Sequence, residues 1–180
     1  MIKKRTFVYF FLLSIISINT FAASNPKSTG DLVARDLQIW GVGWAGHVGI
    51  WTGNEVLEVL NDRKVIHKNS LSSFKRSSPY WGARYGKGAS QAYKVISWGY
   101  KQRYYNPKYT TTAKYRVGGW VKKWVWDSRK KGWVKRSVMQ NAKYRCDTFV
   151  YSSFKNGNGT QLAGWTITPR TVFYNMPYSR

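Results

Sequence analysis

Two β-rich runs separated by a turn dominate the first half of the sequence. Residues 46–51 (GHVGIW) and 56–60 (VLEVL) flank the pair Gly53-Asn54, a pattern typical of an antiparallel hairpin. Because side chains alternate along a strand, His47 lies on the face opposite the apolar residues of its run. Glu58 lies on the returning strand between apolar neighbours, where a carboxylate needs a partner. The sequence therefore predicts that His47 and Glu58 are neighbours, provided that the register agrees.

The rest of the chain predicts an α+β domain in which strands come first and helices follow. Further strands are expected at residues 65–66, 80–85, 120–126 and 133–138. Helices are expected at residues 71–75, 89–104, from Cys146 to a stop at 156–159, and 170–175 after a Thr168-Pro169 helix start. A Gly/Trp loop precedes the hairpin. The length corresponds to one domain, which we place at residues 23–180.

Composition excludes several classes of protein. The 180 residues carry 30 Lys and Arg against 7 Asp and Glu, a formal charge of +23, with 1 Cys and 2 His. A single Cys has no partner for an intrachain disulfide, and three Cys and His in all are too few for a zinc site built from such ligands. An aromatic content of 17% supplies enough apolar area to oppose disorder despite the charge.

The first 22 residues have the pattern of a secretory signal peptide. A basic start at residues 3–5 precedes an apolar run at 7–16, and small residues surround the expected cleavage after Ala22. The run is short for a membrane span, which needs about 20 residues, and an uncleaved anchor is the alternative. We therefore expect a periplasmic or secreted protein that remains strongly basic after cleavage.

The only thiol lies at the start of a predicted helix. A helix N-terminus favours the thiolate of Cys146 and can receive an oxyanion, and Lys143 and Arg145 favour the thiolate as well if they point inward. A nucleophilic Cys needs a base, for which His47 is the candidate, and the imidazole needs a third group, for which Glu58 is the candidate. This chemistry requires no metal and no cofactor.

Other interpretations of these residues remain open. Cys146 would be inert if it is simply a core residue, and His47 could be a structural strand histidine. Gly46 and Gly49 beside His47 leave room for the close approach of another group. The other imidazole, His67, is expected at a strand end on the surface, and orienting the catalytic group is its alternative role.

Several of these stretches resemble the NlpC-type cell-wall cysteine peptidases, which have a papain-like fold. Residues 46–51 with 30–33 (GDLV) resemble the family's His-bearing strands, and residues 145–150 (RCDTFV) resemble its nucleophile helix. Residues 56–58 (VLE) and 168–169 (TP) resemble further motifs of a branch in which the order of Cys and His is reversed. That branch is circularly permuted and includes the YiiX-like proteins and the lecithin retinol acyltransferase group.

The resemblance implies a circularly permuted papain-like fold, in which an antiparallel sheet packs against a helix that carries the Cys. Cys146 would be the nucleophile, His47 the base and Glu58 the residue that orients the imidazole. The implied substrate is an amide or peptide bond of peptidoglycan. Trp44 and Trp51, close to His47, are candidates to line the substrate groove.

Two stretches depart from the family's pattern. Asp147-Thr148 takes the place of the small Ser-Gly pair that follows the nucleophile, and residues 115–138 have no counterpart. Within the latter, residues 120–126 (WVKKWVW) interleave cations with aromatic rings that can stack on sugars or enter a membrane interface. The alternative is that these Trp side chains belong to the core. Residues 100–109 form a second patch of this kind.

Three functions are consistent with the sequence. The first is an exported cysteine hydrolase that acts on peptidoglycan, either in wall remodelling or as a toxin against rival bacteria, and the sequence is silent on any immunity partner. The second keeps the same triad and acts on a lipid or acyl ester. The third is a non-catalytic basic module that binds peptidoglycan or another anionic envelope polymer, or contacts a membrane surface. Nucleic acid would also bind such a charge, but export argues against it as the target.

Overall fold

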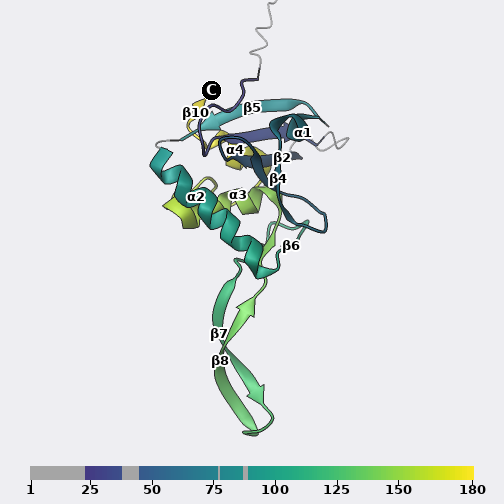
Figure 1. Cartoon of the computed structure of the whole chain (residues 1–180), viewed down its shortest axis with the longest axis vertical. Coiled ribbons are helices and arrows are strands. Elements are labelled where there is room, and N and C mark those ends of the chain that lie inside the picture. The colour runs from purple at the N-terminus through teal and green to yellow at the C-terminus, as the bar shows by residue number, and fades with distance from the viewer. Residues whose placement is uncertain (1–22, 38–44, 77, 87–88) are drawn as a thin grey trace, which may run out of the picture.

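An antiparallel sheet of six strands forms the centre of the molecule (Figure 1). The computed structural model describes residues 23–37, 45–76, 78–86 and 89–180. The strand order is β10-β5-β1-β2-β3-β4, and all five pairings are antiparallel. The strands are β1 (Leu32–Asp36), β2 (Gly46–Trp51), β3 (Val56–Val59), β4 (Ile66–Asn69), β5 (Tyr80–Tyr85) and β10 (Tyr178–Ser179).

Helices cover both faces of the sheet. The helices are α1 (Leu71–Lys75), α2 (Ala89–Lys101) with a 3-10 turn (Gln102–Tyr105), α3 (Cys146–Asn158) and α4 (Pro169–Tyr174). Helices α2, α3 and α4 share the main apolar core with the even-numbered residues of β2, Val48 and Ile50. Helix α1 packs its Phe74 against Val33 and Val56 on the opposite face. The alternation of side chains along each strand thus supplies both layers.

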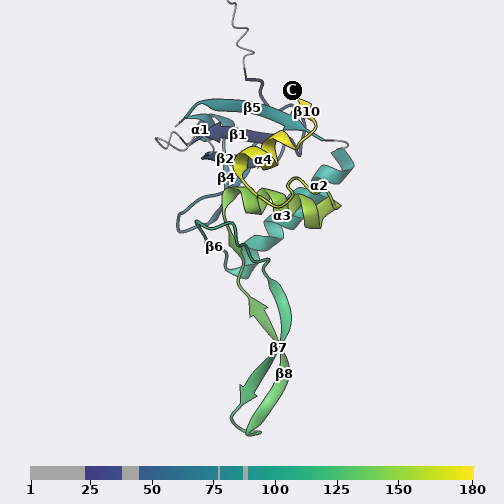
Figure 2. The ribbon, with the colours of Figure 1, turned by 180° about the vertical axis from the view of Figure 1, so that it is seen from behind.

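A two-stranded ribbon, β7 (Gly119–Asp127) and β8 (Gly132–Gln140), projects from this body (Figures 1 and 2). Its strands pair with each other along their whole length and form a separate sheet. At its base, β6 (Lys108–Tyr109) and β9 (Lys143–Tyr144) form a short parallel pair. Only residues 141–145 lie between the end of β8 and Cys146.

Most of the expected elements are confirmed. The hairpin forms with Ile50 opposite Leu57, and α1 and β5 have the expected bounds. The helix expected over residues 89–104 is α-helical only to Lys101, and a 3-10 turn follows it. The observed architecture is an antiparallel sheet with helices, which is α+β. The idea that the ribbon Trp side chains are core residues is wrong, because all four are more than half exposed.

Residues 1–22, the expected signal peptide, lie outside the described residues. Among the residues that the structure describes, no helix has both the length and the apolar character needed to span a bilayer.

Candidate active site

His47 and Glu58 form a buried pair within the sheet. His47 lies at the start of β2 and Glu58 in β3, and the Nε2 atom of His47 is 2.5 Å from the Oε2 atom of Glu58. Their exposed fractions are 4% and 2%. The hairpin predicted from the sequence therefore has the register that brings the two side chains together.

Glu58 makes a second polar contact on its other oxygen. The side-chain amide of Asn69, in β4, donates to Oε1 at 2.6 Å. Burial raises the pKa of the Glu58 carboxyl, but the hydrogen bond and charge of His47, the Asn69 amide and the nearby charge of Arg35 outweigh burial and lower it. Glu58 is therefore held as a carboxylate against the imidazole ring.

Cys146 approaches this pair from the main core side. It is the first residue of α3, is 4% exposed, and its Sγ lies 3.9 Å from the carbonyl oxygen of Gly46, the residue before His47. Cys146 is also one of the two side chains that raise the pKa of the His47 imidazole. The structure thus brings together Cys146, His47 and Glu58 from three separate elements.

The protonation of His47 reflects both neighbours. Burial lowers the pKa of the imidazole, whereas the charge and hydrogen bond of Cys146 and those of Glu58 raise it, with a net rise to about 9. An imidazole that a carboxylate orients and that can take a proton from a neighbouring thiol is the arrangement that activates a cysteine nucleophile. At neutral pH the ring therefore carries a proton that it can donate.

The first turn of α3 is fixed by an ion pair that explains the unusual residues after Cys146. Arg145 makes two hydrogen bonds to the fully buried carboxylate of Asp147, at 2.7 and 2.6 Å, and a third to the carbonyl of Ile167. The hydroxyl of Thr148 accepts from the backbone N–H of Arg145. The expected help of Arg145 to the thiolate is therefore reduced, because Asp147 neutralises its charge. Asp147 and Thr148 serve to hold the helix start in place.

The glycines beside His47 have a different role from the expected one. A Cβ on Gly46 would lie 2.3 Å from the ring of Trp81, and a Cβ on Gly49 would lie 2.4 Å from Val56. The space that we expected for a reacting group is therefore occupied by core side chains. Cys146 instead lies beside the carbonyl oxygen of Gly46, at the start of β2.

The remaining predicted residues have varied outcomes. Trp51 is half-buried and packs against the small cluster beneath α1 rather than at Cys146. Trp44 lies outside the described residues. His67 lies within β4 and is half-buried rather than on the surface at a strand end, with its Nε2 atom 3.7 Å from the carboxylate of Asp62. Glu58, not His67, contacts the ring of His47.

Two residues near the site were missed by sequence reasoning. Asn69 lies outside the expected strand at 65–66, so only the register of the longer β4 could reveal its contact with Glu58. Tyr109 lies in β6, beside β9 and the start of α3. Burial raises the pKa of its hydroxyl, and the negative charge of Cys146 raises it further. Tyr109 therefore lies within electrostatic range of Cys146.

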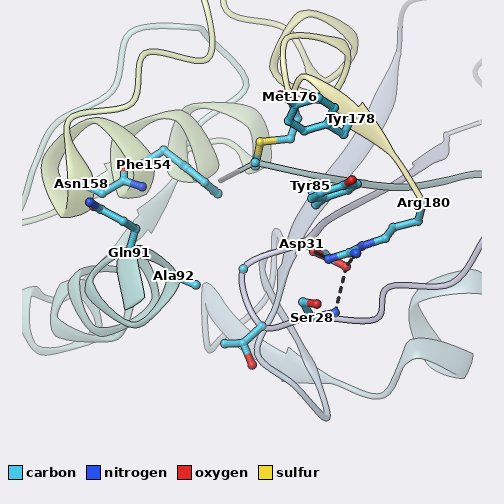
Figure 3. Close-up of a pocket in the computed structure, with 13 residues that line it drawn as sticks. Ser28, Asp31, Tyr85, Gln91, Ala92, Phe154, Asn158, Met176, Tyr178 and Arg180 are labelled. Carbon is cyan, nitrogen blue, oxygen red and sulfur yellow. Dashed lines mark hydrogen bonds and ion pairs between the residues drawn. The ribbon is translucent and has the colours of Figure 1, made fainter. Parts of the chain in front are cut away.

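A cavity of about 400 Å³ lies elsewhere in the molecule (Figure 3). Its lining includes Ala92 of α2, Phe154 and Asn158 of α3 and the ion pair between Asp31 and Arg180. Asn158 is at the far end of α3, roughly 18 Å from the position of Cys146 by helical rise. The cavity is therefore separate from the Cys146 site.

Within the described part of the chain, no group of three or more His, Cys, Asp and Glu side chains is placed to hold a metal ion.

Comparison with known proteins gives no further identification. No family model matches the sequence, and neither a curated protein nor a solved structure matches it.

Proposed function

We propose that this protein is an exported cysteine hydrolase that cleaves an amide or peptide bond of bacterial peptidoglycan. The proposal includes a circularly permuted papain-like fold of the NlpC type, a periplasmic or secreted location and a catalytic triad of Cys146, His47 and Glu58. The observation that carries it is the imidazole of His47, bonded to a buried carboxylate, with the Sγ of Cys146 3.9 Å from the carbonyl oxygen of the preceding residue, Gly46.

The geometry supports a two-step acyl transfer. Because Nε2 of His47 is held by Glu58, Nδ1 is the nitrogen available to exchange a proton with the sulfur. The Cys146 thiolate attacks the carbonyl carbon, the C–N bond breaks, and the imidazolium gives its proton to the leaving amine. Water then attacks the thioester and gives a proton to His47, so that a carboxylic acid leaves and the thiolate is restored.

The start of α3 can stabilise the oxyanion formed in both steps. Backbone N–H groups in the first turn of a helix have no intrahelical acceptor, and that of Cys146 is adjacent to the reacting sulfur. The bonds of Arg145 to Asp147 and to the carbonyl of Ile167 hold this turn rigidly in place.

The test compares the mature protein with its Cys146→Ala variant on purified sacculi, with products identified by mass spectrometry. We expect soluble wall peptides that carry a new amine and a new carboxyl group from the wild type only. Lys155→Ala, an exposed change on the same helix, is the matched control and should retain activity. A wild-type protein that is folded and releases no product from sacculi or from lipid would contradict the proposal.

An acyl-ester substrate is the second candidate, favoured by the exposed aromatic ribbon, which only five residues separate from Cys146. The same thiolate can attack an ester carbonyl, with an alcohol as the leaving group. Incubation with phospholipid vesicles distinguishes the two, because lysolipid or fatty acid would appear in place of wall peptides. Rapid alkylation of Cys146 near neutral pH would support either enzyme and contradict an inert core thiol.

A further inference from the structure

The ribbon carries its large apolar side chains on one face. Its register places Trp120 opposite Met139 and Trp126 opposite Trp133. Alternate residues of each strand share a face. This face, which we call the Trp face, consists of Trp120, Lys122, Trp124, Trp126, Trp133, Lys135, Ser137 and Met139. The exposed fractions of its four Trp side chains lie between 54% and 67%.

The other face carries the cross-strand apolar pairs of the ribbon. Val121 lies opposite Val138, and Val125 lies opposite Val134, and all four side chains are half-buried. Such cross-strand pairs of β-branched residues are the main stabilising units of a two-stranded sheet. At the tip, the carboxylate of Asp127 accepts hydrogen bonds from two backbone N–H groups of the turn and from Arg136. The exposed Trp side chains therefore remain free to meet a partner.

The charge of the ribbon indicates an anionic partner. Residues 119–140 contain seven Lys and Arg and one acidic residue, Asp127, which is paired with Arg136. Lys122 and Lys135 lie among the Trp side chains of the Trp face, and three further cations occupy the turn at residues 129–131. A surface of negative charge with an apolar layer beneath it would satisfy both the cations and the rings.

We propose that the Trp face docks on a phospholipid bilayer that contains anionic headgroups. Trp rings favour the boundary between headgroups and acyl chains, where the ring is buried and its N–H stays among polar groups. Lys122 and Lys135 can extend their ammonium groups to the phosphates while their stems stay with the rings. A strand of nine residues is about 30 Å long, so the Trp face offers the surface an extended line of contacts.

The geometry favours a bilayer over a glycan. Trp126 and Trp133 meet edge to face, with an interplanar angle of 75° and centroids 5.9 Å apart, so that they do not form one flat platform for a sugar ring. The Trp face also has no carboxylate and no amide side chain to bind sugar hydroxyls. The proposal does not depend on catalysis by Cys146 and is tested in the Cys146→Ala protein.

The test measures co-sedimentation of the full mature Cys146→Ala protein with vesicles. We expect binding to vesicles of phosphatidylglycerol and phosphatidylcholine, and weak binding to phosphatidylcholine alone. Adding Trp124→Ala, Trp126→Ala and Trp133→Ala together should weaken binding at least about tenfold, because three rings that would be buried in the bilayer are lost. Trp165→Ala, which removes a fully exposed Trp outside the ribbon, is the matched control and should leave binding unchanged.

A second comparison distinguishes binding through the ribbon from attraction by the overall positive charge of the protein. Lys122→Glu with Lys135→Glu should weaken binding more than Lys94→Glu with Lys101→Glu, which makes the same charge change on exposed positions of α2. Equal losses in the two pairs, or no loss in the triple Trp variant, would overturn the proposal. Trp-dependent binding to sacculi or to single-stranded DNA without binding to anionic vesicles would also overturn it, in favour of those partners. Unchanged melting temperatures show that each variant is folded.

Discussion

His47 owes its protonation to two side chains that come from different elements. Because interaction with Cys146 is the largest influence that raises its pKa to about 9, the Cys146→Ala change should lower this pKa. The measurement is an NMR titration of the His47 ring in both proteins, with His67 as the internal reference in the same spectra. A pKa of His47 that is unaffected by the loss of the sulfur would contradict the contact between the two side chains.

The same groups make stability depend on pH in a defined window. The pKa of His47 is raised from 6.5 to about 9, so its contribution to the free energy of unfolding is complete below pH 6.5 and is lost as pH rises through about 9. The pKa of Glu58 is lowered from 4.5, so its contribution is complete above pH 4.5 and is lost as pH falls through the folded value.

We therefore expect the stability difference between the wild type and His47→Gln to be largest between pH 4.5 and 6.5. Denaturant unfolding across a pH series measures this difference. A difference that grows between pH 7 and pH 9 would have the wrong sign for a raised pKa.

Asn69 is expected to act as a positioning residue for Glu58. Asn69→Ala removes the donor to Oε1, which should raise the pKa of Glu58 and lower the free energy of unfolding by about 1 to 3 kcal/mol. Product formation should fall because the imidazole is less well oriented. The pKa of His47 is the readout that separates this role from a purely structural one. Asn61→Ala, at an exposed position between β3 and β4, is the control.

For single residues, the sequence predicts the candidate catalytic side chains but not the neighbouring side chains that contact or surround them. The Gly/Asn turn sets the hairpin, and hairpin alternation is enough to pair His47 with Glu58. Asn69 depends on the register of a third strand, and Tyr109 depends on a parallel bridge between short segments far apart in the sequence. Local patterns contain no information on either contact.

Gly49 lets β2 pack closely against its neighbours, because it has no side chain. In Gly49→Ala the added methyl group would lie 2.4 Å from Val56 and 3.4 Å from Phe74, which also contacts His47. We expect a loss of about 1 to 3 kcal/mol in unfolding free energy together with lower activity, because the strand that carries His47 must move. Denaturant unfolding and product assays measure both effects.

Gly119→Ala is the matched control, since it adds the same methyl group to a strand glycine with no atom within 4 Å. Equal effects of the two changes would show that the crowding around Gly49 is unimportant.

Most elements can be predicted because each has a local signal. The Thr168-Pro169 helix start and the even spacing of the ribbon Trp residues both predict the correct structure. The exposure of the ribbon cannot be predicted, because a strand with one aromatic face has the same periodicity whether that face is covered or not. The role of Asp147 was also hidden, since its partner Arg145 lies two residues away and is anchored by distant carbonyls.

At the scale of the whole molecule, the ribbon is expected to be dispensable for folding. Among the described residues, neither apolar cluster includes a side chain from residues 119–140. Gly119 and Gln140 face each other in register, so an Asn-Gly turn can replace residues 120–139. We expect the shortened protein to unfold cooperatively, with a melting temperature within a few degrees of the full protein and the same alkylation rate of Cys146.

Calorimetry and thiol labelling provide these measurements. Loss of the cooperative transition on excision would show that the ribbon belongs to the folding unit. Retention of the transition with slower labelling would show instead that the ribbon base shapes the approach to Cys146.

The short connection between β8 and α3 has a geometric consequence. Residues 141–145 include a pair bonded to β6, so the ribbon and the first turn of α3 are joined by a short, partly fixed segment. A surface that binds the ribbon would therefore also influence the distance and the orientation of the Cys146 sulfur relative to that surface. A substrate bond held at the same distance from the surface would encounter the sulfur repeatedly. A freely diffusing substrate would encounter it only by chance.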